Sequence, residues 1–295
     1  MLNPIGFSIP ESKICSLTEL KKTKITSHLI PGQLDTYIYK NEEEYYHEYG
    51  KSFFAVTMKK GGWDCLRHYE IIANGCIPYF IDIDKCPENV MTFFPKDLVK
   101  QGNALYERIV AANDFSDNNA RECSELIKNL LDYAKTYLTT KKMAEYVLSR
   151  IQKKTISRIL YLSGDVRPDY LRCLTLHGFK ELLGSNCHDY PKVPHLYNCS
   201  DINYSELYGK GMTYSALLDQ ELHNDELDES IMSDIKNHHY DIVIYGSYHR
   251  GMPLFDLVKQ FYSPNEIILF CGEDFQDFHK EDFLAEGYTL FVREL

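Results

Sequence analysis

The segment Gly61–Asp82, GGWDCLRHYEIIANGCIPYFID, joins a glycine turn, an amphipathic helix and an apolar strand. Apolar residues recur at helical spacing from Leu66 to Ala73, and Gly75 follows them as a helix C-cap. The next six residues, Cys76–Ile81, are nearly all apolar, as in a strand that is buried on both faces of a parallel sheet. A turn, a helix and a buried strand in this order predict the phosphate-binding part of a nucleotide-binding α/β domain.

The charged residues of this segment are placed to meet an anionic ligand. Arg67 and Glu70 are three residues apart, so they share one face of the predicted helix. Strand carboxyl ends and helix amino ends are where such sheets bind ligands, and four residues fall there: Lys59, Lys60, Gly61 and Gly62.

Composition narrows the class of protein. The chain has 295 residues, 44% of them hydrophobic, which is enough for two domains of ordinary size. A formal charge of -11 disfavours nucleic acid as the main partner. The apolar runs are much shorter than the roughly 20 residues that span a bilayer, and the start of the chain has no secretory pattern, so we expect no membrane span and a cytoplasmic protein. Nine cysteines without a CxxC pair favour reduced thiols.

Strands alternate with helices in both halves of the chain, which predicts an α/β protein with two Rossmann-like domains facing a cleft, residues 1–152 and 157–295. In the first half we expect extended segments at Ile5–Ile9, Thr36–Tyr39 and Phe53–Thr57, and helices at Asn41–Tyr49, Lys96–Ala112, Asn119–Leu138 and Thr140–Gln152. In the second we expect strands at 158–162, 240–245, 266–271 and from 289 onward, and helices at 170–183, 228–237 and 253–262. The Asn-, Pro-, His- and Tyr-rich residues that follow the helix 170–183, up to Gly211, are expected to form a substrate-facing loop.

The spacing from Arg67 through Glu70 to the run Gly75-Cys76-Ile77-Pro78 resembles the donor-site signature of exostosin-like glycosyltransferases. The match is local. It implies a GT-B architecture, an inverting reaction, a uridine diphosphate (UDP) sugar donor such as UDP-xylose or UDP-galactose, and an oligosaccharide or glycoprotein glycan as acceptor. It also implies that Glu70 contacts the ribose or base, and that Arg67 and the Lys-Gly turn contact the diphosphate. The first half would then bind the donor and the second half the acceptor.

Transfer from such a donor needs cationic groups at the leaving diphosphate and a base at the acceptor hydroxyl. Arg67, Lys60 and the helix amino end can supply the positive charge, so we expect no cofactor and no requirement for a divalent metal. Base candidates follow predicted strands of the second half. We favour Asp165 in a glycine turn, with His249 as an alternative and Asp274 as a third; Asp165 or Asp169 could instead cap the next helix. The expected acceptor-binding residues are Arg167, Arg250, Glu273 and Asp274.

Two patterns suggest metal binding only superficially. Asp82-Ile83-Asp84 has a D-x-D form, but it ends a strand, and we interpret it as a solvated loop. His238 and His239 lack partner ligands at metal spacing, which favours a surface or structural role.

The order of the halves departs from the family, in which the donor half comes second. We therefore expect a circular permutation, with the segment 140–157 as the new connection and the chain ends close together. Two other functions remain open, since fold alone does not determine function: a sugar-nucleotide epimerase or hydrolase on the same framework, and a catalytically silent nucleotide- or glycan-binding module.

Overall fold

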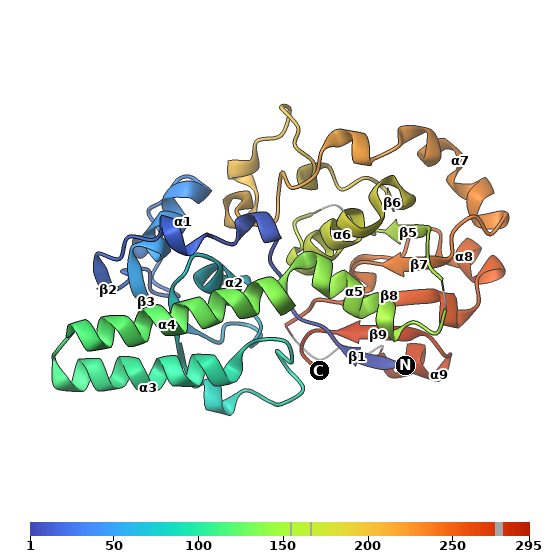
Figure 1. The fold of residues 1–295 in the computed structure, drawn as a ribbon. Helices are drawn as coiled ribbons and strands as arrows, with labels where there is room; N and C mark the ends of the chain where they lie inside the picture. Colours follow the sequence, from blue (N-terminus) through green and yellow to red (C-terminus); the bar gives the residue numbers. More distant parts are fainter. Residues whose placement is uncertain (154, 166, 275–279) are drawn as a thin grey trace. The chain divides into compact units, whose positions relative to one another are not determined.

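The computed structural model describes residues 1–153, 155–165, 167–274 and 280–295 (Figure 1). The chain forms two compact units, one made of Gly6–Thr139 and the other of Met1–Ile5 together with Thr140–Leu295. We expected the division between residues 152 and 157. The observed division falls earlier because α5 (Thr140–Arg150) packs against α6 (Tyr170–Leu183), and the first residues join the larger unit because their strand pairs in its sheet.

The smaller unit contains a three-stranded parallel sheet in the order β2-β3-β4. Its strands are β2 (Lys24–Thr26), β3 (Ser52–Met58) and β4 (Ile77–Ile81), connected by the helices α1 (Glu42–Gly50) and α2 (Leu66–Ala73). The central strand β3 pairs Phe54 with Ile77, and both side chains are fully buried. This arrangement places the Lys59–Gly62 turn between the end of β3 and the start of α2.

Two long helices complete this unit. They are α3 (Lys96–Ala112) and α4 (Asp117–Tyr133), and α4 continues as a π-helical turn, Ala134–Leu138. Both are amphipathic: α3 buries Val99 and Ile109, while the Ser116 side chain caps α4 by accepting a hydrogen bond from the Asn119 amide. The helices pack on each other and on β4, which covers the apolar strand predicted from the sequence.

The larger unit contains a six-stranded, fully parallel sheet in the order β1-β9-β8-β7-β5-β6. Its strands are β1 (Leu2–Pro4), β5 (Ile159–Leu162), β6 (Cys187–Tyr190), β7 (Ile242–Tyr245), β8 (Ile267–Cys271) and β9 (Thr289–Val292). The remaining helices α7 (Asp225–Lys236), α8 (Phe255–Phe261) and α9 (Lys280–Ala285) follow β6, β7 and β8 in turn. Every residue of β5, β7, β8 and β9 is buried, as expected for a parallel sheet covered on both faces.

The order of this sheet reverses between β5 and β7. From β5 the chain goes outward to β6 at one edge, then returns to β7 and continues through β8 and β9. Open parallel sheets bind ligands at such a switch point, outside the carboxyl ends of the two strands. The loops that begin at Ser163 and Gly246 leave the sheet at this point.

The α/β class and the parallel sheets agree with the sequence-based expectation. Two predicted extended segments differ from the structure, and two strands were not predicted. The strand expected at Ile5–Ile9 lies earlier, at Leu2–Pro4, where a partner strand is available. The segment expected at Thr36–Tyr39 begins with the last residue of the 3-10 turn Leu34–Thr36 and is not part of a strand. Strands β2 and β6 were not expected, because both sequences are rich in polar residues. In the described part of the chain, no helix combines the length and apolar character that crossing a bilayer demands.

Candidate functional site

Three loops of the larger unit meet at the carboxyl ends of β5, β7 and β8. The Ser247 hydroxyl, after β7, donates a hydrogen bond to the Asp169 carboxylate, after β5. Gly164 lies so close to the loop after β7 that an added Cβ would be 2.3 Å from the Gly251 carbonyl oxygen. A Cβ on Gly272, after β8, would be 3.7 Å from Oδ1 of Asp169. The three loops therefore form one polar surface at the switch point.

Asp169 is the structural carboxylate of this surface. Its Oδ1 accepts a hydrogen bond of 3.0 Å from the Arg172 amide, which makes it the N-cap of α6. Its Oδ2 also pairs with Nε of Arg250 at 3.1 Å, and the side chain is almost fully buried. The helix-capping alternative thus applies to Asp169 and not to Asp165.

The carboxylate of Asp165 forms an ion pair with the neighbouring Arg167. Its Oδ2 accepts hydrogen bonds from Nε and Nη2 of Arg167 at 2.9 and 2.6 Å, and its Oδ1 accepts one from the Arg167 amide. These hydrogen bonds lower the pKa of the Asp165 carboxyl to about 2. A carboxylate with so low a pKa is a weak base near neutral pH, which is unfavourable for the role we expected of it.

His249 has the properties that Asp165 lacks. Its Nε2 lies 2.7 Å from Oε1 of Glu273, and the ring is mostly buried. Burial lowers the pKa of the imidazole, although Glu273 and Asp169 act in the opposite direction, so the neutral form is favoured. Nδ1 has no hydrogen-bond partner among the residues that the structure describes. A neutral imidazole next to a carboxylate is suited to accept a proton.

The other expected acceptor-side residues have different surroundings. Arg250 donates from Nη1 to the Pro168 carbonyl at 3.2 Å in addition to its contact with Asp169. Asp274 forms an ion pair with the buried Arg293, and the side chain of Arg167 is 80% exposed. The loops after β7 and β8 thus bring together His249, Arg250 and Glu273. Asp274 instead pairs with Arg293, the residue that follows β9.

Arg172 is a buried residue of this region that sequence reasoning missed. Its side chain is fully buried on α6 and donates to the carbonyl oxygens of Asp165 and Arg167. It therefore fixes the backbone of the loop after β5. The signal for it in the sequence is a lone arginine within the apolar run Tyr170–Leu174.

In the smaller unit, the Lys59–Gly62 turn lies where the sequence predicted it, after β3 and before α2. Both lysines are exposed. Nζ of Lys59 lies 5.5 Å from the ring centroid of Trp63, and the Lys60 amide donates to the Gly62 carbonyl at 3.0 Å, which closes the turn.

Arg67 and Glu70 project from α2 into an aromatic environment. Oε2 of Glu70 accepts a hydrogen bond of 2.8 Å from the Tyr45 hydroxyl, and Glu70 is only 7% exposed. The guanidinium of Arg67 lies 5.7 Å from the ring centroid of Tyr37. Nη1 of Arg67 and the Tyr37 hydroxyl are both buried, and although the two side chains interact electrostatically, neither atom has a hydrogen bond of good geometry in the described part of the chain. A buried, unpaired guanidinium nitrogen is costly, and an anionic ligand would satisfy it.

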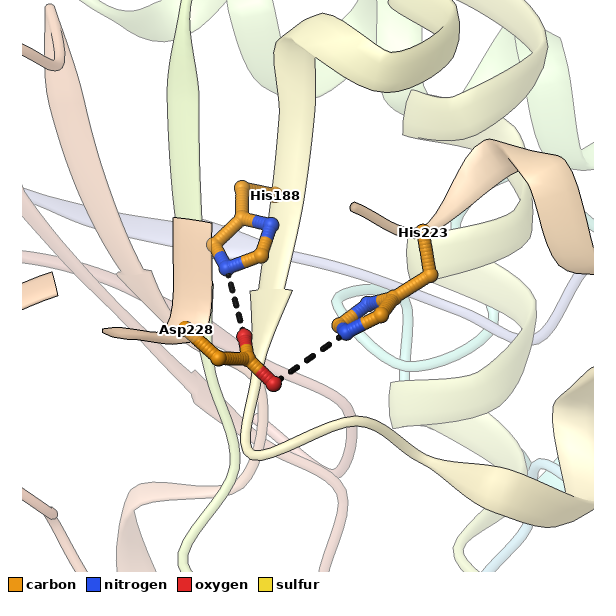
Figure 2. A group of neighbouring side chains, drawn as sticks. All are labelled: His188, His223 and Asp228. Carbon is orange, nitrogen blue, oxygen red and sulfur yellow. Dashed lines mark hydrogen bonds and ion pairs between the residues drawn. The ribbon is translucent and has the colours of Figure 1, made fainter. Parts of the chain in front are cut away.

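The D-x-D motif and the His238-His239 pair, which resemble metal-binding patterns, make other contacts in the structure. Asp82 and Asp84 form ion pairs with Lys85 and Lys100 at 2.9 and 2.8 Å, and both carboxylates are largely exposed. His238 contacts the Phe261 carbonyl at 3.0 Å. A different group has the composition of a metal site and was not expected: His188, His223 and Asp228 (Figure 2).

Comparisons of the chain with protein-family models, with curated proteins and with solved structures give no match. The architecture therefore defines the class of protein by itself. It is an α/β protein whose larger unit has a Rossmann-like parallel sheet with a polar surface at the switch point.

Proposed function

We propose that this protein is an inverting glycosyltransferase that moves a sugar from a UDP-sugar donor to a glycan acceptor. In this proposal the protein has a two-domain GT-B architecture, the Gly6–Thr139 unit binds the donor, and the larger unit binds the acceptor and supplies the base. The observation that carries the proposal is Arg67, which is at the position of the resemblance and has a buried Nη1 without a partner among the described residues.

The proposed donor-binding role of the smaller unit rests on its cationic side chains. Departure of UDP builds negative charge on the diphosphate, and fixed hydrogen-bond donors stabilise that charge most when water is excluded. Arg67 is held over Tyr37 and can donate to a phosphate oxygen, while the exposed Lys59 and Lys60 add positive charge from the adjoining turn. Glu70 would contact the ribose or base. We propose that these residues suffice without a metal ion at the diphosphate.

We assign the base to His249 rather than Asp165. Its neutral imidazole would take the proton from the acceptor hydroxyl, and Glu273 would orient the ring and stabilise the imidazolium that forms. The acceptor oxygen would then attack the anomeric carbon on the face opposite UDP, the bond to UDP would break, and the configuration would invert. Arg250, adjoining His249, is available for acceptor hydroxyl groups.

The order of the units fits a circular permutation. β1 pairs in parallel with β9, Leu2 opposite Leu290 and Pro4 opposite Val292, so the first and last strands of the chain are neighbours in one sheet. Numbered from β5, the strands have the doubly wound order 2-1-3-4-5-6, with β1 as the sixth. This pairing supports the permutation in our proposal.

The test is nucleotide binding to wild-type protein and to Arg67→Lys, with Arg108→Lys as the control on the same unit. Arg108 lies on the exposed face of α3, paired with Glu122. We expect UDP to raise the melting temperature of the wild type and of Arg108→Lys, since a ligand that binds only the folded state stabilises it. We expect a much smaller rise for Arg67→Lys, because lysine cannot reproduce the planar fork of arginine.

Measuring the turnover of UDP-sugars distinguishes the transferase from the alternative functions. A UDP-sugar that raises the melting temperature and is consumed in the presence of glycan acceptors supports the transferase. Binding of UDP without any turnover would instead support the silent binding module, and isomerised or hydrolysed donor would support the epimerase or hydrolase. A preference for guanosine nucleotides would refute the uridine assignment.

A further inference from the structure

His188, His223 and Asp228 come from three consecutive parts of the larger unit. His188 is on β6, His223 precedes α7, and Asp228 is in the first turn of α7 (Figure 2). Nε2 of His188 lies 2.8 Å from Oδ1 of Asp228, and Nε2 of His223 lies 3.3 Å from Oδ2 of the same carboxylate. One potential ligand atom from each residue lies within 4.8 Å of the others.

Two of these atoms are buried without a satisfactory partner. His188 is 1% exposed, and neither its Nε2 nor Oδ1 of Asp228 has a hydrogen-bond partner in the described ranges, because the two approach each other without hydrogen-bond geometry. Buried polar atoms are nearly always satisfied. Two that face the same space therefore indicate a missing positive centre between them.

A second layer of contacts orients His223. The carboxylate of Asp189 is completely buried and accepts hydrogen bonds from Nδ1 of His223 at 3.1 Å and from the Tyr197 hydroxyl at 2.5 Å. Both hydrogen bonds end on Oδ1 of Asp189. Nζ of Lys180 lies 2.9 Å from the same Oδ1 and balances the negative charge of the carboxylate. If Nδ1 remains the donor to Asp189, a metal ion can replace the proton on Nε2 of His223, the nitrogen that faces Asp228. A carboxylate behind a histidine is the usual outer layer of a metal-binding histidine.

We propose that His188, His223 and Asp228 bind a zinc ion. The ligand atoms are Nε2 of each histidine and a carboxylate oxygen. Tetrahedral ligands at about 2.0–2.1 Å from zinc are about 3.3 Å apart. The histidine nitrogens lie 2.8 and 3.3 Å from the two Asp228 oxygens, and the three ligand atoms lie within 4.8 Å of one another, so small side-chain shifts would complete the geometry. Oδ1 of Asp225 lies 3.4 Å from Nε2 of His223 on an exposed side chain, so it can supply the fourth ligand. Two imidazoles favour zinc over magnesium or calcium, which prefer oxygen ligands.

The site would have a structural role that is separate from the proposed transfer reaction. The zinc ion would connect the edge strand β6 with the start of α7. These two elements flank the long segment between Tyr190 and Asp225. In that segment the structure has only short 3-10 helices as regular helical structure. Zinc would therefore tie together the two ends of a segment that contains no α-helix, and its binding energy would add to the stability of the fold.

The experiment measures metal in the untagged full-length protein. We expect about one zinc per chain after purification in zinc-containing medium, and a lower melting temperature after chelation that zinc restores. Asp228→Asn and His223→Gln should bind zinc at least about tenfold more weakly. His238→Gln, which changes a histidine outside the cluster, should bind zinc as the wild type does.

Cobalt replaces zinc in a second measurement that does not depend on the variants' folding. Cobalt bound to the chelated wild-type protein should show the visible bands of a tetrahedral site and no thiolate charge-transfer band, because the proposed ligands include no cysteine. The proposal is refuted if zinc does not bind to the chelated wild type. A thiolate band, or unchanged zinc affinity in a folded Asp228→Asn protein, would also refute it by showing that zinc binds elsewhere, such as at the free cysteines.

Discussion

Asp165 follows β5 and His249 follows β7, and each has a charged neighbour of a different kind. Asp165 faces the cation of Arg167, which stabilises its ionised form. His249 faces the anion of Glu273 but is buried enough that the pKa of the ring is lowered overall. The two residues would therefore give different pH dependences if either acted as the base, because a base is active only when deprotonated.

The acidic limb of the pH profile tests this assignment. With His249 as the base, kcat/KM for transfer should be constant near neutral pH and should fall as the pH drops through a pKa below 6.5, because the histidine becomes protonated there. The groups that set this pKa are Glu273 and Asp169, which raise it, and Arg250, which lowers it. His249→Asn should reduce kcat by about 10²–10⁴-fold.

His239→Asn is the matched control, since His239 contacts Arg158 outside this surface. It should leave the profile unchanged. If activity instead persisted in His249→Asn and was lost in Asp165→Asn, with an acidic limb near the Asp165 pKa of about 2, then Asp165 would be the base.

At the scale of elements, α5 and α6 are held together by a close approach at Gly178. A Cβ added there would lie 2.1 Å from the Thr140 carbonyl oxygen and 3.2 Å from Cβ of Ala144. The first contact is with backbone, which cannot rotate away. Gly178→Ala should therefore destabilise the larger unit by about 1–3 kcal/mol, even though alanine favours helix.

Gly50→Ala is the matched comparison on α1, because the nearest atoms to an added Cβ there are 3.9 and 4.0 Å away. It should leave the free energy of unfolding unchanged or raise it by up to about 1 kcal/mol. Denaturant unfolding of both variants measures the difference. Equal effects at the two positions would mean that helix propensity, and not the contact with α5, determines the result.

The elements that could be predicted from the sequence are those whose own residues are apolar. Phe53–Thr57 and Ile77–Ile81 are strands in both descriptions, since burial on both faces of a sheet needs an unbroken apolar run. β6 could not be recognised in this way. Its residues His188 and Asp189 are as buried as any apolar strand residue, but Asp189 accepts hydrogen bonds from Tyr197 and His223, and His188 faces Asp228, all of them in later segments of the chain.

The same limit applies to the candidate site. The Lys59–Gly62 turn, Arg67 and Glu70 were predictable because local spacing places them on one turn and one helix face. The pairing of His249 with Glu273 depends on β7 and β8 being neighbours in the sheet, and the contacts of Asp169 with Ser247 and Arg250 depend on β5 and β7 being neighbours. Contacts of this kind follow from strand order, which local patterns do not contain.

At the scale of the whole molecule, the pairing of β1 with β9 makes the two ends of the chain parts of one sheet. A protein that begins at Thr140, continues through Leu295, a linker and Met1, and ends at Thr139 should therefore fold. The strands are parallel, so the linker must return along the sheet, which needs a crossover of about a dozen residues. A flexible linker of about 12 Gly and Ser residues spans this distance.

This rearranged protein places the larger unit first, the order that the exostosin-like resemblance implies. We expect its circular dichroism spectrum to match the wild type, and its melting temperature to lie within a few degrees of the wild-type value, because the new ends fall between the two compact units. The control opens the same linked chain between Leu176 and His177, inside α6, where the buried helix should lose its packing. The circular-permutation hypothesis would be contradicted if the protein that begins at Thr140 and ends at Thr139 were unfolded under conditions in which the wild type is folded. Retention of UDP binding would extend the agreement from the fold to the donor site.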